Sequence, residues 1–250
     1  MSANIVAEDN YVNFARLLED MLTTTKPRVL ILGGSIVGSG MDLLLSRSDF
    51  EFIESDVAFG PRTSIVLDAH AIPFSDCSFD GVIAQAVLEH VVDPGKVVDE
   101  IHRVLRDDGI VYADTPFMQQ VHAGAYDFTR FTHLGHRRLF RKFDEIASGA
   151  TCGTGMALAW SYKAFLMSLT NKKSLHKLAM VFAAFTSFFF KYMDKFTINN
   201  PASLDAASGI YFLGRKSAAV LSDRELLLQY RGAGRPAAIE MPSEATAEER

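Results

Sequence analysis

The chain has 250 residues, 48% of them hydrophobic and 22% charged, and its net charge is −5. This is the composition of a globular protein, and the length favours one α/β domain with an insertion or tail. Because the net charge is negative, the chain has no general attraction to phosphate backbones, and we expect no nucleic-acid partner. The cysteines, Cys77 and Cys152, are too far apart to indicate a disulfide framework or a zinc motif, which fits a reducing compartment.

The N-terminal residues lack the basic start and apolar run of a signal peptide. The longest nearly apolar run, residues 178–190, is shorter than the roughly 20 residues that a membrane-spanning helix needs. We therefore expect a cytoplasmic protein without a spanning segment.

Strand and helix patterns alternate through the first 150 residues. The clearest helix follows Asp93, since Pro94 suits the first helical position, apolar residues recur at helical spacing, and Gly109 lies past its end. Such alternation predicts a parallel sheet with crossover helices. Strands are expected near 28–33, 50–55, 63–67, 79–84, 109–114 and 143–148, and helices near 10–22, 40–47, 94–106 and 134–140.

The pattern changes after residue 150. Residues 157–196 predict two helices rich in Leu, Phe and Met, separated by the polar segment 170–174, before an apolar run at 210–213. This indicates a helical insertion, about residues 155–200, before the last strand of a domain spanning 1–216. Beyond it a helical stub at 223–230 gives way to Gly, Pro, Ala and Glu, so 217–250 is expected to be a flexible tail.

A glycine turn follows the first strand. Gly33 and Gly34 begin it, and Gly38 and Gly40 continue it, so backbone N–H groups can approach a ligand at a helix N-terminus. Asp56 ends the next strand at about the spacing that separates a glycine turn from a ribose-binding acid. This order predicts a cofactor that contains adenosine. A nicotinamide cofactor is disfavoured because no complete G-x-G-x-x-G occurs.

Three further segments carry a family resemblance: residues 65–74, residues 78–83 and 86–91, and residues 103–109 with Thr115-Pro116-Phe117. In this order they resemble class I S-adenosylmethionine-dependent methyltransferases of the type 11 group, over roughly residues 27–150. Residues 155–216 also resemble a helical extension found in a bacterial subset. The resemblance implies a doubly wound, Rossmann-like seven-stranded sheet whose antiparallel strand is the run 210–214.

The same resemblance implies a set of residues for S-adenosylmethionine. Asp56 would hold the ribose hydroxyls, Asp68 and Ala69 the adenine edge, and Gln85 the methionine moiety; Gly33, Gly34 and Ser35 would contact the methionine and ribose portion. One position departs from the family, because Ile31 stands where an acid usually orients the cofactor's ammonium group. Either another acceptor replaces it, or cofactor affinity is compromised. A rival interpretation is a non-catalytic binding or scaffold protein that keeps the fold.

The loop after the fifth strand is the candidate acceptor site, because ligands bind at the carboxyl edge of open α/β sheets. In it His122 is a candidate general base, Tyr126 could line the pocket, and Asp127 could orient His122 or pair with Arg130. The alternative is that the Asp127–Arg130 pair only holds the loop in place. Glu89 and His90 are interpreted as packing and helix-end residues and are not counted among the catalytic candidates. No metal is expected, since His122, Asp127, His133 and His136 form no compact ligand motif and both later histidines could face solvent.

The insertion carries aromatic residues along one helical face with lysines at its ends. It could cover the site, form a homodimer surface packed against Trp160, Phe165 and Leu166, or lie on an anionic membrane. An apolar cover suits a bulky acceptor. The sequence thus predicts an S-adenosylmethionine-dependent methyltransferase, cytoplasmic or at the inner face of the membrane, that O-methylates a saccharide, lipid-linked glycan or other bulky hydroxyl compound. C- or N-methylation of a small metabolite is the other enzymatic alternative.

Overall fold

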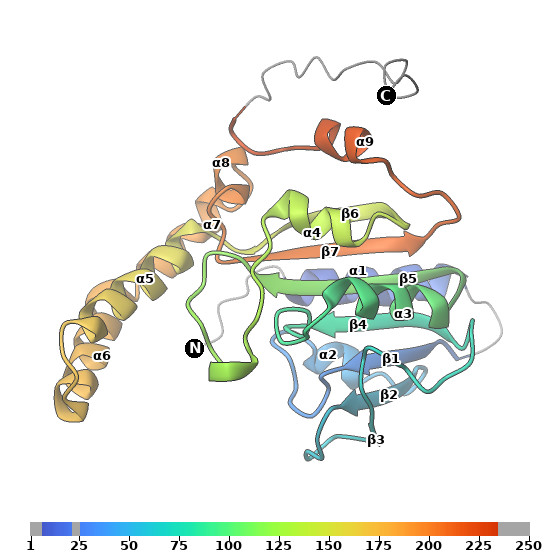
Figure 1. Ribbon diagram of the computed structural model, residues 1–250, viewed down its shortest axis with the longest axis horizontal. Helices are drawn as coiled ribbons and strands as arrows, with labels where there is room; N and C mark the ends of the chain where they lie inside the picture. Colours follow the sequence, from blue (N-terminus) through green and yellow to red (C-terminus); the bar gives the residue numbers. More distant parts are fainter. Residues whose placement is uncertain (1–6, 22–25, 235–250) are drawn as a thin grey trace, which may run out of the picture.

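The computed structural model describes residues 7–21 and 26–234. These residues form a mixed sheet of seven strands in the order β3-β2-β1-β4-β5-β7-β6 (Figure 1). The strands are β1 (Arg28–Leu32), β2 (Glu51–Asp56), β3 (Ile65–Val66), β4 (Phe79–Gln85), β5 (Leu105–Pro116), β6 (Phe143–Cys152) and β7 (Gly209–Lys216). The helices are α1 (Ala7–Met21), α2 (Asp42–Leu45), α3 (Pro94–Val104), the 3-10 turn η1 (Gly124–Tyr126), α4 (His133–Leu139), α5 (Thr154–Ser168), α6 (Lys173–Ser187), α7 (Phe190–Thr197), α8 (Pro201–Leu204) and α9 (Asp223–Leu228).

Strands β1 to β5 run parallel, and β7 enters between β5 and β6 antiparallel to both. The predicted fold class is therefore confirmed, including the antiparallel strand expected at 210–214. Because β6 is antiparallel to β7, it runs in the same direction as β5. The carboxyl ends of β1, β2, β4, β5 and β6 consequently meet at one edge of the sheet.

Helices cover both faces of the sheet. On one face α1 and α2 pack against β1, β4 and β5, and Tyr11, Phe14 and Leu18 are buried there. On the other face α3 packs its buried stripe of Val97, Val98, Ile101 and Val104. With both faces covered, β4 is buried along nearly its whole length, including its apolar stretch Val82, Ile83 and Ala84.

Helix α3 shows how local sequence sets an element boundary. The Asp93 side chain accepts a hydrogen bond from the backbone N–H of Lys96, and Pro94 occupies the first turn. This cap fixes the start of α3 directly after the loop that follows β4. That loop carries part of the site described below.

Helices α5, α6 and α7, residues 154–197, form an arm that projects away from the sheet (Figure 1). The arm has three helices where the sequence predicted two, because the chain breaks again at Phe188 and Phe189. Its root is held by Asp194 of α7, whose buried carboxylate accepts hydrogen bonds from Gly153, Gly155 and Met156 N–H at 3.1, 2.7 and 3.0 Å. These are unpaired donors at the start of α5, so the acid both caps that helix and ties α7 to it.

The expectation of a flexible tail from residue 217 is wrong for residues 217–234. Helix α9 packs on α4, Leu226 is buried, and Ser222 and Glu225 form a capping box. Arg231 pairs with Glu145 of β6 at 3.1 Å. The apolar side of this short helix supplies enough burial to order it; residues 235–250 lie outside the described part of the chain. No helix among the described residues is both long and apolar enough to cross a membrane.

Candidate active site

The glycine turn after β1 is held against the end of β2. Gly33 has a φ of +70°, and a Cβ added there would lie 2.7 Å from Val87 Cγ2, so glycine is required on both counts. Gly34 N–H donates to Ser55 O at 2.8 Å, and Ser35 N–H donates to Asp56 Oδ2 at 3.3 Å. Asp56 thus lies beside the turn, and its contact with a cofactor ribose stays a prediction.

Gln85, at the end of β4, lies on the other side of the same turn. Its Nε2 donates to Ser39 O at 3.2 Å, whereas its buried Oε1 has no hydrogen-bond partner among the described residues. A Cβ added to Gly38 would lie only 1.6 Å from Oε1, so the missing side chain at Gly38 makes room for the amide. An acceptor without a donor beside a glycine turn fits the ammonium or hydroxyl groups of an adenosine cofactor that carries an amino acid.

Packing explains the apolar residue at position 31, where the family resemblance implies an acid. Ile31 is 2% exposed and belongs to the core on the α1 and α2 face. No carboxylate of β1 therefore reaches the turn from this position. Beside the turn, Gln85 Oε1 presents a buried acceptor without a hydrogen-bond partner among the described residues.

Asp68, predicted at the adenine edge, has local partners. Its Oδ1 accepts from His70 N–H at 2.9 Å and lies 2.6 Å from His70 Nδ1, and these contacts lower the pKa of Asp68. His70 Nε2 in turn accepts from Asp93 N–H at 3.2 Å. Asp68 thereby links the end of β3 to the start of α3, while Ala69 beside it is buried. Its contact with a cofactor stays a prediction.

The loop after β5 is closed by Arg130. Its guanidinium pairs with Asp127 through two contacts and donates to the carbonyl oxygens of Gln119 and Gln120 at 3.1 and 3.2 Å. The Asp127 side chain is 1% exposed and accepts His122 N–H at 2.7 Å. The ion pair considered from the sequence is therefore present, and it holds the backbone of His122 in place. Tyr126 is exposed at the rim of this loop.

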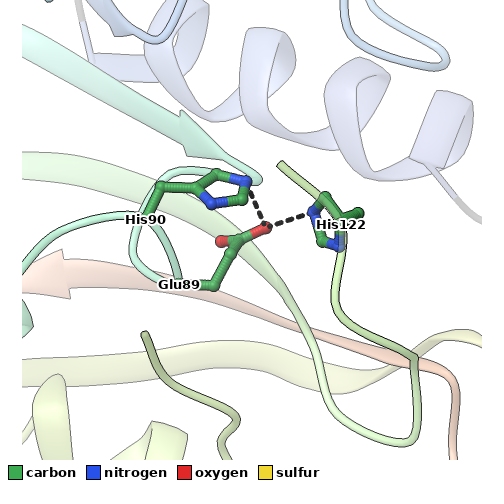
Figure 2. Close-up of side chains that lie close together, drawn as sticks. All are labelled: Glu89, His90 and His122. Carbon is green, nitrogen blue, oxygen red and sulfur yellow. Dashed lines mark ion pairs between the residues drawn. The ribbon is translucent and has the colours of Figure 1, made fainter. Parts of the chain in front are cut away.

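Three side chains from two segments meet above this edge (Figure 2). Glu89 and His90 follow β4, and His122 follows β5; one carboxylate oxygen of Glu89 lies 3.7 Å from Nε2 of each histidine. The two rings contact edge to face with centroids 4.8 Å apart, and His90 Nδ1 lies 2.7 Å from Tyr126 O. We call this set the Glu–His cluster.

Because Glu89 is buried, its carboxylate interacts strongly with the two histidines of the Glu–His cluster. The Glu89 side chain is fully buried, and neither of its oxygens has a hydrogen-bond partner among the described residues. A carboxylate in that position is costly unless a cation compensates it, and the two imidazoles are the groups that can do so. Accordingly Glu89 raises the pKa of His122 above its ordinary value; partial burial of the ring opposes this effect, and Asp127 adds to it.

The same three residues have the ligand types of a metal site, with their ligand atoms within 4.8 Å of one another. The set considered from the sequence is different and does not assemble. His133 and His136 are 8% and 1% exposed instead of facing solvent, and burial lowers the pKa of His133 to about 4 and that of His136 to about 3.

Sequence reasoning placed His122 in the site but assigned Glu89 and His90 to packing. The available signal was their position, two titratable residues within five positions of the end of a buried strand at the carboxyl edge. The strained backbone points to the same place, since Ala86 and Ala123 both have positive φ, 53° and 55°.

The arm begins at this edge as well. Gln120 Nε2 donates to Ser161 Oγ of α5 at 3.1 Å, which joins the loop that carries His122 to the arm. A compound bound over the Glu–His cluster would therefore lie near the root of the arm.

Comparisons with known proteins agree with this fold. Residues 45–113 match the family model of a methyltransferase domain. Similar solved structures include a putative sarcosine dimethylglycine methyltransferase from Galdieria sulphuraria, with a TM-score of 0.51 at 16% identity over 85% of this chain and 85% of that one. Another is the MccD protein, with a TM-score of 0.51 at 12% identity over 84% of this chain and 96% of that one. No curated protein matches the sequence.

The strand order, the antiparallel β7 and the glycine turn at the carboxyl edge define a Rossmann-like methyltransferase fold. The matched segment runs from α2 through most of β5 and so spans Asp56, Gln85 and two members of the Glu–His cluster. A methyltransferase-domain match within this fold supports S-adenosylmethionine-dependent methyl transfer as the activity.

Proposed function

We propose that this enzyme methylates a hydroxyl group of a saccharide, a lipid-linked glycan or another bulky acceptor, with His122 as the general base. The observation that carries the proposal is the buried Glu89 carboxylate 3.7 Å from His122 Nε2, at the edge of the sheet where the cofactor turn also lies. A hydroxyl must lose its proton during methyl transfer, whereas a neutral amine already offers a lone pair.

On the cofactor side, Asp56 would accept hydrogen bonds from the ribose hydroxyls, and Gln85 Oε1 would accept one from the ammonium group. Gly33, Gly34 and Ser35 would contact the methionine and ribose portion between these two groups. Asp68 and Ala69 would border the adenine. Bound there, S-adenosylmethionine supplies an electrophilic methyl group on a sulfonium. The contribution of the protein is then to hold the acceptor oxygen in line with that methyl group and to exclude water.

On the acceptor side, His122 would take the hydroxyl proton, and the Glu89 carboxylate 3.7 Å from its Nε2 would stabilise the resulting imidazolium. Asp127 and Arg130 act as positioning residues, because they hold the His122 backbone from below the loop. Tyr126, exposed on the same loop, would contact the acceptor. His90 shares the Glu89 oxygen and would orient that carboxylate.

The exposed apolar arm favours a large acceptor over a small one. It starts beside the site and presents apolar side chains to the surroundings, so an acceptor with a lipid carrier would find apolar surface next to the reacting group. A cytoplasmic enzyme working at the inner face of the membrane fits this arrangement.

The test is the rate of methyl transfer to glycan and lipid-linked acceptors as a function of pH. His122→Ala should lower kcat by roughly 10²–10⁴-fold, while His102→Gln in the last turn of α3 should leave it unchanged.

The pH dependence of the rate tests the same assignment. Because His122 must be neutral to accept a proton, the rate falls as pH drops through its raised pKa. Glu89→Gln removes the charge that raises this pKa, so the acidic limb should move to lower pH. An unaltered rate in His122→Ala would refute the base assignment and favour N- or C-methylation.

A further inference from the structure

The arm is the largest exposed apolar surface in the described part of the chain. Fifteen of the 29 exposed large hydrophobic side chains there lie between Leu158 and Phe196. Phe185 is 81% exposed, Val181 68% and Leu178 64%. The arm therefore does not cover the site as a buried lid. Soluble proteins rarely leave such a surface bare, so it marks an interaction site.

Charge separates the arm from the rest of the molecule. Residues 154–197 contain six lysines and one acid, Asp194, a net charge of +5. Because the whole chain carries −5, the remaining residues carry −10. The only acid of the arm is 2% exposed and occupied with capping α5, so all the accessible ionic charge of the arm is positive.

The lysines flank the apolar stretch. Lys172, Lys173 and Lys177 lie at one end and Lys191 and Lys195 at the other, and residues 178–190 between them carry no charge. Long lysine side chains at the ends of an apolar helix can keep their ammonium groups at the headgroups while the aromatic rings enter the acyl boundary.

A groove runs between α5 and the α6–α7 segment, with a volume of about 360 Å³. Apolar side chains such as Met156, Trp160 and Met180 line it, and Lys163 and Lys191 are part of its wall. Each of these two lysines lies over an aromatic ring, Lys163 over Trp160 at 4.9 Å and Lys191 over Tyr192 at 4.8 Å. An apolar groove with cations in its wall is complementary to an acyl chain and its anionic headgroup.

We propose that the arm docks the enzyme on a bilayer rich in anionic phospholipids. A second copy of the arm would bring like charges together, whereas an anionic lipid surface attracts the lysines and accepts the exposed aromatic side chains. The acidic body, repelled by the same surface, would stay on the solvent side with the arm inserted. This docking is separate from the methyl-transfer chemistry and does not depend on the acceptor.

The experiment is co-sedimentation of the full-length protein with vesicles of phosphatidylcholine alone or mixed with phosphatidylglycerol, at low and high salt. We expect binding to the mixed vesicles that weakens with salt, and at most weak binding to phosphatidylcholine. Lys172→Gln/Lys173→Gln/Lys177→Gln should lower the partition coefficient roughly 100-fold, at about 0.7 of a decade per lysine. Phe182→Ser/Phe185→Ser should lower it at least roughly tenfold.

A matched control, Val220→Ser/Leu228→Ser, removes two exposed apolar side chains outside the arm and should not change binding. Light scattering after size exclusion of each variant reports the oligomeric state, and circular dichroism confirms folding. Equal binding to both vesicle types, no binding to either, or a dimer that only the arm substitutions dissolve would overturn the proposal.

Discussion

Asp127→Asn tests how the acceptor loop is held. The Asp127 side chain is 1% exposed and pairs with Arg130 as well as accepting His122 N–H. The Arg130 guanidinium, together with that backbone donor, lowers the pKa of Asp127 from 3.8 to about 2. By linkage this difference contributes about 2.5 kcal/mol to the free energy of unfolding at neutral pH. Breaking a buried pair by removing one charge typically costs 3–5 kcal/mol, so we expect a loss of about 2–4 kcal/mol.

The pH dependence gives the sharper check. A carboxyl group whose pKa is lowered by folding contributes stability above its unfolded pKa, and loses it as pH falls through the folded value. The difference in free energy of unfolding between wild type and Asp127→Asn should therefore have its full value at pH 7 and fall to about half of it at pH 3. Urea unfolding at both pH values measures it. Asp107→Asn, at a carboxylate that is 97% exposed, is the control and should have no measurable effect. A difference below about 1 kcal/mol at pH 7, or one that is equally large at pH 3, would refute the reasoning.

Two further predictions concern the cofactor and a metal. Asp56→Ala should weaken S-adenosylmethionine binding by about 1.5–3 kcal/mol, roughly 10–150-fold, through loss of two charge-assisted hydrogen bonds, and calorimetry showing wild-type affinity would remove Asp56 from the site. Dialysis against EDTA should leave the methyl-transfer rate unchanged if His122 acts as the base; a loss that Zn²⁺ or Mn²⁺ restores would instead show that the Glu–His cluster binds a metal ion and that His122 is a ligand.

Local sequence patterns predicted the elements that form the sheet. The apolar runs of β1 and β4, the cap and proline at the start of α3, and the run that became β7 are short-range signals. The glycine turn with Asp56 was equally readable, because a βαβ unit brings residues about 20 apart to one edge whatever the rest of the fold.

Local patterns failed where the outcome depended on what a side chain would pack against. His133 and His136 read as surface residues of a short basic helix, yet both are buried. The sequence of the insertion left a cover, a dimer face and a membrane surface open. Only its projection from the sheet shows that it does not bury its aromatic face on its own core (Figure 1). Periodicity gives the apolar face of a helix but not the surface that it meets.

The sequence by itself determined the alternation of strands and helices and the glycine turn next to Asp56, because apolar periodicity and glycine spacing are carried by neighbouring residues. Only the tertiary structure decided the Glu–His cluster. Glu89 and His122 are distant in the chain, and they meet because β4 and β5 pair in parallel and end at the same edge, with Asp127 and Arg130 closing the loop over Glu89. Side chains that act together are brought together by strand pairing, and that pairing cannot be read from the residues around either one.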